Sequence, residues 1–270
     1  MRRSIVLAVL FTAACGSNQT STPASVPDVA PMRVQFTWDN DFDRLDNLFT
    51  TGGITQAQFE AVIAAVHSVY DQKAKLNGET LQINDNWDDP TVNANCMRHD
   101  GLVEINMYGG LARRPEVSTE GFALVLCHEL SHAYGGLPYV QIYSKMSAEG
   151  QADYAGAKDC LKAVLPVLDN APQEVMGMLN PETYEAEQCG ARFDETSASY
   201  SVCVRQFSAA KSLGNLLSTL NRETVPNFET PDPTVVKKTL TSYPATTQCR
   251  LDTYNNGILG LARPKCWFNR

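Results

Sequence analysis

Apolar residues recur three or four positions apart along much of the chain, as they do on the buried face of a helix. Residues 55–70 show this pattern first, and Thr55 and Gln58 stand at the spacing of a capping box. The same pattern predicts three further helices, over residues 119–134, 147–164 and 197–220. We expect the second of these to end before Pro166, because proline interrupts the hydrogen bonding of a helix interior.

Three shorter segments look like strands: residues 81–87, 91–98 and 102–107. The last of them alternates apolar and polar positions, and His99, Asp100 and Gly101 form a turn signal in front of it. A small sheet near the start of the chain, followed by mostly helical sequence, indicates an α+β fold.

The composition is that of an acidic protein with enough apolar residues for a substantial core. Hydrophobic residues make up 43% of the 270 positions, charged residues 19%, and the formal net charge is −8. Nucleic-acid binding requires a basic face, so this class of partner is excluded. Beyond the first residues, no apolar run in the sequence is long enough to span a bilayer.

The first residues have the composition of an export signal rather than of a folded element. A basic start is followed by an apolar run that ends in Ala13 and Ala14, directly before Cys15. This order resembles a bacterial lipoprotein signal, in which the cysteine is lipidated. Thr12 stands where a larger aliphatic residue is usual, so an ordinary secretory signal is the alternative. We therefore expect a signal peptide at residues 1–14, a lipidated Cys15 with a flexible tether at 15–31, and one domain at 32–270.

A lipid anchor on Cys15 places the expected mature protein in the bacterial cell envelope, and Gly16 after it favours the outer membrane. Seven further cysteines follow, none in a CxxC pair, so in this oxidising compartment they are predicted to form disulfides. Because seven is odd, at least one stays free, and we expect this to be Cys127. The expected pairs are Cys160 with Cys203 and Cys249 with Cys266.

The sequence His128-Glu129-Leu130-Ser131-His132 is an HExxH motif within a predicted helix. Residues four apart lie on one face of a helix, so both imidazoles can bind a single zinc ion. Glu129 is placed to take a proton from a metal-activated water and to pass it to the leaving amine.

The third ligand is expected to be a carboxylate. Metzincins extend the motif to HExxHxxGxxH, and here Gly135 matches the glycine while Pro138 replaces the final histidine. No other histidine follows in the chain. Glu149, in the first turn of the next helix, is the best candidate, and Asp153 lies on the same face, where it can accept a hydrogen bond from a ligand imidazole.

The HExxH helix and the helical ExxxD sequence together resemble the gluzincin metallopeptidases. They are especially similar to the HtpX and CAAX-prenyl-protease group, over about residues 102–161. The resemblance implies a zincin-like fold, one zinc ion held with Glu149, and a substrate that binds along an edge strand at residues 102–107.

That group also carries a later H-P…R motif near the active site, and residues 242–250 are similar to it, with Tyr243 in place of the histidine. The resemblance implies that Tyr243 donates a hydrogen bond to the oxyanion of the transition state. It also implies that Arg250 orients a carboxylate or the substrate.

The leading hypothesis from these features is a zinc-dependent metalloendopeptidase that acts on a protein or peptide substrate. The alternative is a catalytically inactive pseudo-peptidase that serves as a membrane-anchored binding or assembly module. A third possibility is a structural lipoprotein with an accidental motif. Metal analysis separates the third from the first two, and loss of activity on changing Glu129 alone separates the first from the second.

Overall fold

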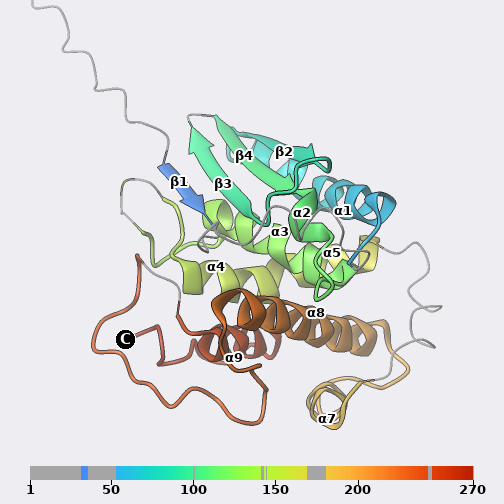
Figure 1. Ribbon diagram of the computed structural model, residues 1–270, viewed down its shortest axis with the longest axis vertical. Helices are drawn as coiled ribbons and strands as arrows, with labels where there is room; N and C mark the ends of the chain where they lie inside the picture. The colour runs from blue at the N-terminus through green and yellow to red at the C-terminus, as the bar shows by residue number, and fades with distance from the viewer. Residues whose placement is uncertain are drawn as a thin grey trace, which may run out of the picture. The chain divides into compact units, whose positions relative to one another are not determined.

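The computed structural model describes residues 32–35, 53–99, 101–140, 143, 145–168, 181–242 and 245–269. These residues form a small sheet and a set of helices around a main hydrophobic core (Figure 1), so the expected α+β class is confirmed. None of the described helices is long and apolar enough to cross a bilayer. The expected signal peptide, Cys15 and the tether lie outside the described residues, as does Tyr243.

Four strands form the sheet in the order β1-β3-β4-β2. They are β1 Met32–Gln35, β2 Thr80–Asn86, β3 Ala94–His99 and β4 Leu102–Tyr108. β3 pairs antiparallel with β1 and β4, whereas β2 pairs parallel with β4. The predicted turn joins β3 to β4, with Gly101 at a φ of 77°.

β4 lies inside the sheet, so the expectation that this strand offers a free edge to a substrate is wrong. Its backbone pairs with β2 on one side and with β3 on the other. Val103, Ile105 and Met107 on its apolar face are fully buried. Alternation along a strand reveals which face is buried, but it does not reveal whether a neighbouring strand lies on each side.

Helix α1, Gln56–Leu76, begins at the predicted capping box. The Thr55 hydroxyl accepts a hydrogen bond from the backbone N–H of Gln58, and the Gln58 side chain accepts one from the backbone N–H of Thr55 at 2.9 Å. Its apolar face packs against β2 and α3 and buries Phe59 completely. A short helix, α2 at Gly109–Ala112, follows the sheet.

Helix α3, Thr119–Tyr134, has the bounds that the sequence predicts. At its start the Ser118 hydroxyl accepts a hydrogen bond from the N–H of Gly121 at 3.0 Å. Every residue from Gly121 to Ala133 is buried, because α3 lies between the sheet and helix α8, Ala198–Asn221 (Figure 1). The HExxH motif is therefore in the interior of the protein.

The next helical stretch carries Glu149 and Asp153. It consists of α4 Glu149–Ala155, the π-helix η2 Gly156–Leu161 and α5 Lys162–Leu168. The expected end before Pro166 is wrong, because the helix continues to Leu168 with Pro166 inside it. Proline lacks an N–H, so one backbone hydrogen bond is missing there, within a turn of the helix end. At Gly156 a Cβ would lie 3.2 Å from the backbone nitrogen of His128, so the glycine lets this stretch approach α3 closely.

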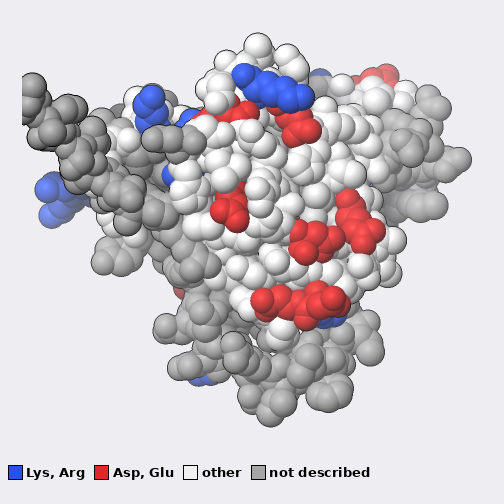
Figure 2. Space-filling view, turned by 90° about the horizontal axis from the view of Figure 1, so that it is seen from above, with Lys and Arg blue, Asp and Glu red and all other residues white. Residues whose placement is uncertain are grey.

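Two further helices complete the described part: α7 Thr183–Gly190 and α9 Thr247–Ile258. α9 packs against α8, α4 and η2. Figure 2 looks down on the end of the molecule where Figure 1 shows the sheet, and acidic side chains are spread among uncharged ones on this face. The acidic character expected from the composition is visible there.

The disulfides follow the packing of these helices rather than the predicted pairs. Cys127 is bonded to Cys160, Cys189 to Cys203, and Cys249 to Cys266. The Cys249–Cys266 prediction is confirmed, whereas the Cys160–Cys203 pair and a free Cys127 are wrong. The reason is that α3, which carries Cys127, packs against η2, which carries Cys160. Cys96, buried on β3, is the free cysteine of the described residues.

Candidate metal centre

Two imidazoles and one carboxylate converge between α3 and α4. Nε2 of His128 lies 3.1 Å from Nε2 of His132. The Glu149 oxygens lie 3.3 Å from Nε2 of His128 and 3.6 Å from Nε2 of His132. These three buried side chains form a group that can hold a metal ion. A second such group in the described residues, Asp232 with Cys249 and Cys266, has both sulfurs in a disulfide and is set aside.

The spacing of the three groups fits a small ion. Ligand atoms at about 2.0–2.1 Å from a tetrahedral zinc ion lie roughly 3.4 Å from one another. The separations, 3.1 Å between the two imidazole nitrogens and 3.3 and 3.6 Å from these nitrogens to the two Glu149 oxygens, are close to that value. The residues predicted from the HExxH and ExxxD sequences are thus brought together at the distance that coordination requires.

The second nitrogen of each imidazole is held by a hydrogen bond. Nδ1 of His132 donates to the backbone carbonyl of Ser147 at 2.8 Å, so Nε2 of this ring presents its lone pair to the site. Nδ1 of His128 donates to Oδ1 of Asp153 at 2.8 Å. Such hydrogen bonds fix the orientation of a ligand imidazole and increase its basicity.

The two imidazoles differ in protonation in the metal-free protein. Burial lowers the pKa of His132 to about 4, so this ring is neutral at pH 7. Burial also acts to lower the pKa of His128, but the Asp153 carboxylate outweighs it and raises the pKa to about 9. One proton therefore occupies the space between the three ligand groups, and a cation has to replace it.

Asp153 is the centre of a buried network that fixes His128. Arg250 donates to its two oxygens, from Nε at 2.8 Å and from a terminal nitrogen at 2.7 Å. The Tyr254 hydroxyl donates to Oδ1 at 2.9 Å. Although burial alone would raise the pKa of Asp153, Arg250 and His128 hold it well below its usual range. The carboxylate is therefore ionised throughout the neutral range.

The structure thus places Arg250 on Asp153, which agrees with its expected role of orienting a carboxylate. Tyr254 is not predicted from the sequence, although it follows Arg250 by four residues and so shares a face of α9. Ser147, whose backbone carbonyl orients His132, carries no signal because any residue supplies a carbonyl. The position of Tyr243 lies outside the described residues.

Glu129 has no hydrogen-bond partner for either side-chain oxygen among the described residues, and it is fully buried. Burial raises its pKa to about 8, an effect that His128 opposes and Glu149 reinforces. A buried carboxyl group without a partner costs stability. Its place beside two imidazoles that could hold a metal ion is therefore unexplained by packing alone.

The site is enclosed. His128, Glu129 and His132 are 0% exposed, and Glu149 is 8% exposed. A cavity of about 430 Å³ lies elsewhere, between η2, residues 192–193 and the end of α9, and no predicted site residue lines it. Of the three candidate metal ligands, Glu149 thus has the largest exposed fraction.

Comparison with known proteins adds no relative. No family model matches the chain, and neither the curated proteins nor the solved structures provide a match. The site is therefore interpreted from its own geometry and chemistry.

Proposed function

We propose that this chain is a zinc-dependent metalloendopeptidase of the gluzincin type. The observation that carries the proposal is the buried Glu129 carboxyl group, which lacks a hydrogen-bond partner among the described residues and adjoins the His128 ligand. Zinc is proposed because it takes imidazole and carboxylate ligands, and catalytic zinc sites use three protein ligands with one position left open. The HExxH and ExxxD resemblance points the same way.

In this proposal the residues of the chain have separate roles. His128, His132 and Glu149 hold the ion, which when bound supplies Lewis acidity and lowers the pKa of water. Glu129 accepts a proton from the attacking water and returns it to the leaving amine. In the metal-free protein, burial raises the pKa of this carboxyl group to about 8, so it is a stronger base than an exposed glutamate.

Two further parts of the proposal rest on the sequence. Tyr243 is proposed to donate a hydrogen bond to the oxyanion, since a phenol stays protonated near pH 7. Cys15 is proposed to carry a lipid anchor that holds the domain in the bacterial cell envelope, where a protein or peptide would be the substrate. Nucleic acid is not a proposed partner.

The second candidate function is a catalytically inactive pseudo-peptidase, anchored as a binding or assembly module. The observation that favours it is the enclosure of the site, because a substrate must reach side chains that are 0% exposed. Under this alternative the metal stabilises the fold and Glu129 has no catalytic role.

Zinc content and cleavage of a quenched fluorogenic peptide library decide between the two functions. The peptidase is expected to cleave, and Glu129→Gln is expected to keep the zinc while losing the activity. A matched control is Glu60→Gln, an exposed carboxylate on α1 that accepts a hydrogen bond from the Gln56 side chain. Zinc retention with no cleavage by the wild type would support the pseudo-peptidase. If zinc is absent from the wild type both as purified and after loading with zinc, both functions are ruled out.

A further inference from the structure

The first turn of α4 supplies Glu149, and the residue at its N-cap has no polar side chain to cap it. Its N-cap residue, Ala148, makes no side-chain hydrogen bond to the helix. The backbone N–H of Ala148 donates to the carbonyl of Pro138 at 2.8 Å, which fixes the chain before the turn. Some other contact has to hold the turn itself, because a helix end without a cap frays readily.

That contact comes from the C-terminal end of the chain. Trp267, 1% exposed, lies directly against Gly150, the residue after Glu149. A Cβ at Gly150 would be only 2.2 Å from the indole, so any other residue here would displace the ring or the helix. The indole thus presses on the backbone of the ligand-bearing turn.

Two hydrogen bonds extend this contact along α4. Arg263 donates to the side chain of Gln151 at 2.7 Å, and the Tyr154 hydroxyl donates to the carbonyl of Leu261 at 2.6 Å. Residues 261–267, which we term the C-terminal strap, therefore contact α4 over its length.

The strap is also joined to the loop that follows the HExxH helix. Arg263 donates to the carbonyl of Leu137 at 2.9 Å, and Gln151 donates to the carbonyl of Gly135 at 2.7 Å. The strap, α4 and this loop thus form one connected unit around the ligands.

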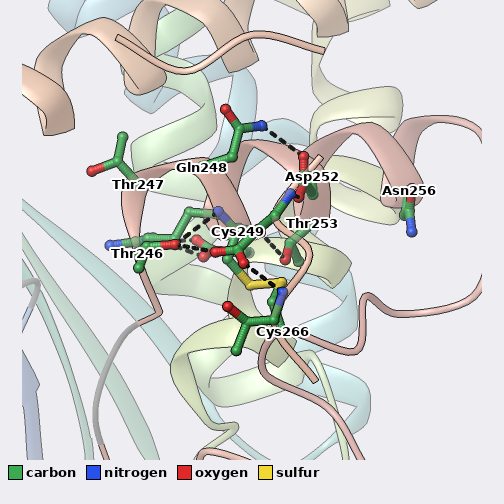
Figure 3. The surroundings of a disulfide bond; sticks show 12 residues. Thr246, Thr247, Gln248, Cys249, Asp252, Thr253, Asn256 and Cys266 are labelled. Carbon is green, nitrogen blue, oxygen red and sulfur yellow. Dashed lines mark hydrogen bonds and ion pairs between the residues drawn. A yellow bond between two sulfur atoms is a disulfide. The ribbon is translucent and has the colours of Figure 1, made fainter. Parts of the chain in front are cut away.

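A disulfide closes the strap onto α9. Cys266 precedes Trp267, and its partner Cys249 precedes Arg250 (Figure 3). The bond joins two segments that each contact the metal site: Trp267 adjoins the turn of Glu149, and Arg250 holds the carboxylate behind His128. Cys249, Cys266 and Trp267 are buried together in a small cluster of their own.

We propose that Trp267 is a positioning residue for Glu149 and that the Cys249–Cys266 disulfide holds Trp267 in place. Metal affinity then depends on the formation of this one disulfide. The inference rests on the metal site that the proposed function uses, but not on peptidase activity. Without the bond, the indole withdraws from Gly150, the uncapped turn loosens, and the Glu149 carboxylate spends less time at the ion.

The test is metal affinity, measured by titration with Co²⁺, whose visible absorption reports the ligand geometry. The Cys249→Ser/Cys266→Ser variant is expected to bind Co²⁺ about 10- to 100-fold more weakly, the range seen when groups that support metal ligands are changed. Its absorption in the visible region is expected to change as well. The matched control is Cys189→Ser/Cys203→Ser, because that disulfide lies in a separate apolar cluster away from the ligands. Equal affinities of the two variants would overturn the proposal.

A double-mutant cycle tests the contact itself and keeps all three disulfides. Gly150→Ala is expected to weaken Co²⁺ binding in the wild type, where the new methyl group meets the indole, but to have little effect in a Trp267→Ala background. Trp267→Phe is expected to retain more affinity than Trp267→Ala. If Gly150→Ala is equally harmful in both backgrounds, Trp267 does not position the turn. A wild type that binds Co²⁺ normally but cleaves no peptide overturns only the proposed peptidase function.

Discussion

Oδ1 of Asp153 lies 2.8 Å from Nδ1 of His128, so the helix that provides one ligand also orients another. Because Glu149 and Asp153 share a face of α4, a shift of this helix moves a ligand and the support of a second ligand together. The affinity of the site for metal should therefore be sensitive to changes in α4.

Asp153→Asn tests this relationship. The amide keeps the shape of the carboxylate but removes the charge that faces His128 and Arg250, so metal affinity should fall by about 10- to 100-fold. Breaking the buried pair with Arg250 should also lower the free energy of unfolding, by about 3–5 kcal/mol. Metal titration and denaturant unfolding measure the two effects. The control is Asp252→Asn on α9, whose carboxylate accepts hydrogen bonds from the Gln248 side chain and the Asp232 backbone N–H. An equal loss of metal affinity in this control would contradict the role assigned to Asp153.

Glu129→Gln should abolish activity while zinc stays bound, since an amide cannot accept the proton. General acid–base catalysis contributes about 10²- to 10⁴-fold, and turnover should fall by that factor. Steady-state kinetics at fixed zinc occupancy provides the measurement. Turnover within a few-fold of the wild type would show that Glu129 is not the base.

The same variant should change how the stability of the metal-free protein depends on pH. The pKa of Glu129 is about 8 in the folded protein and near 4.5 when exposed. The unfolded carboxyl group thus loses its proton first, so the contribution of Glu129 to stability falls as the pH rises from about 5 to 8. Glu129→Gln should lose less over this interval in urea unfolding at several pH values. Parallel curves for both proteins would show that the carboxyl group is not perturbed.

Metal affinity should rise with pH across the neutral range. The His128 proton, with a pKa of about 9, must leave before the ring can bind an ion. Each unit of pH below this pKa should therefore weaken binding by about tenfold, with a plateau above it. His132, with a pKa of about 4, should compete with the metal only in acid. Calorimetry in buffers of different ionisation enthalpy should detect about one proton released at pH 7, and none released would contradict this picture.

Tyr243→Phe tests the donor that the resemblance implies. Removing one oxyanion donor lowers turnover by about 10²- to 10³-fold, and zinc content should not change. Kinetics of the variant provide the measurement, with Tyr200→Phe, in the separate apolar cluster that contains Cys203, as the control. A change of less than about threefold would mean that the phenol packs and does not donate.

The sequence was most informative where one helix contains the whole feature. His128, Glu129 and His132 lie within a single turn and a half, so their spacing alone predicts their common face. Glu149 is predicted less directly, because the absence of a further histidine after His132 points only to a carboxylate. Tyr254 was missed, since its contact with Asp153 spans 101 residues and depends on how α9 packs on α4.

Contacts between elements account for the other differences from the predictions. Cys127 was expected to stay free, but it faces Cys160 because the π-helix lies against α3. The alternation of strand β4 predicts its buried face, but not that β2, which precedes it in the chain, pairs with it in parallel. Local periodicity gives the faces of each element and leaves their neighbours undetermined.

The Cys127–Cys160 bond has a consequence for the order in which the protein matures. Its two cysteines are 0% and 1% exposed, and one of them directly precedes the His128 ligand. An oxidant can reach these sulfurs only while the helices are still apart, so thiol oxidation has to precede the final closure of the interior. Protein made in a reducing cytosol would therefore close its interior without this bond.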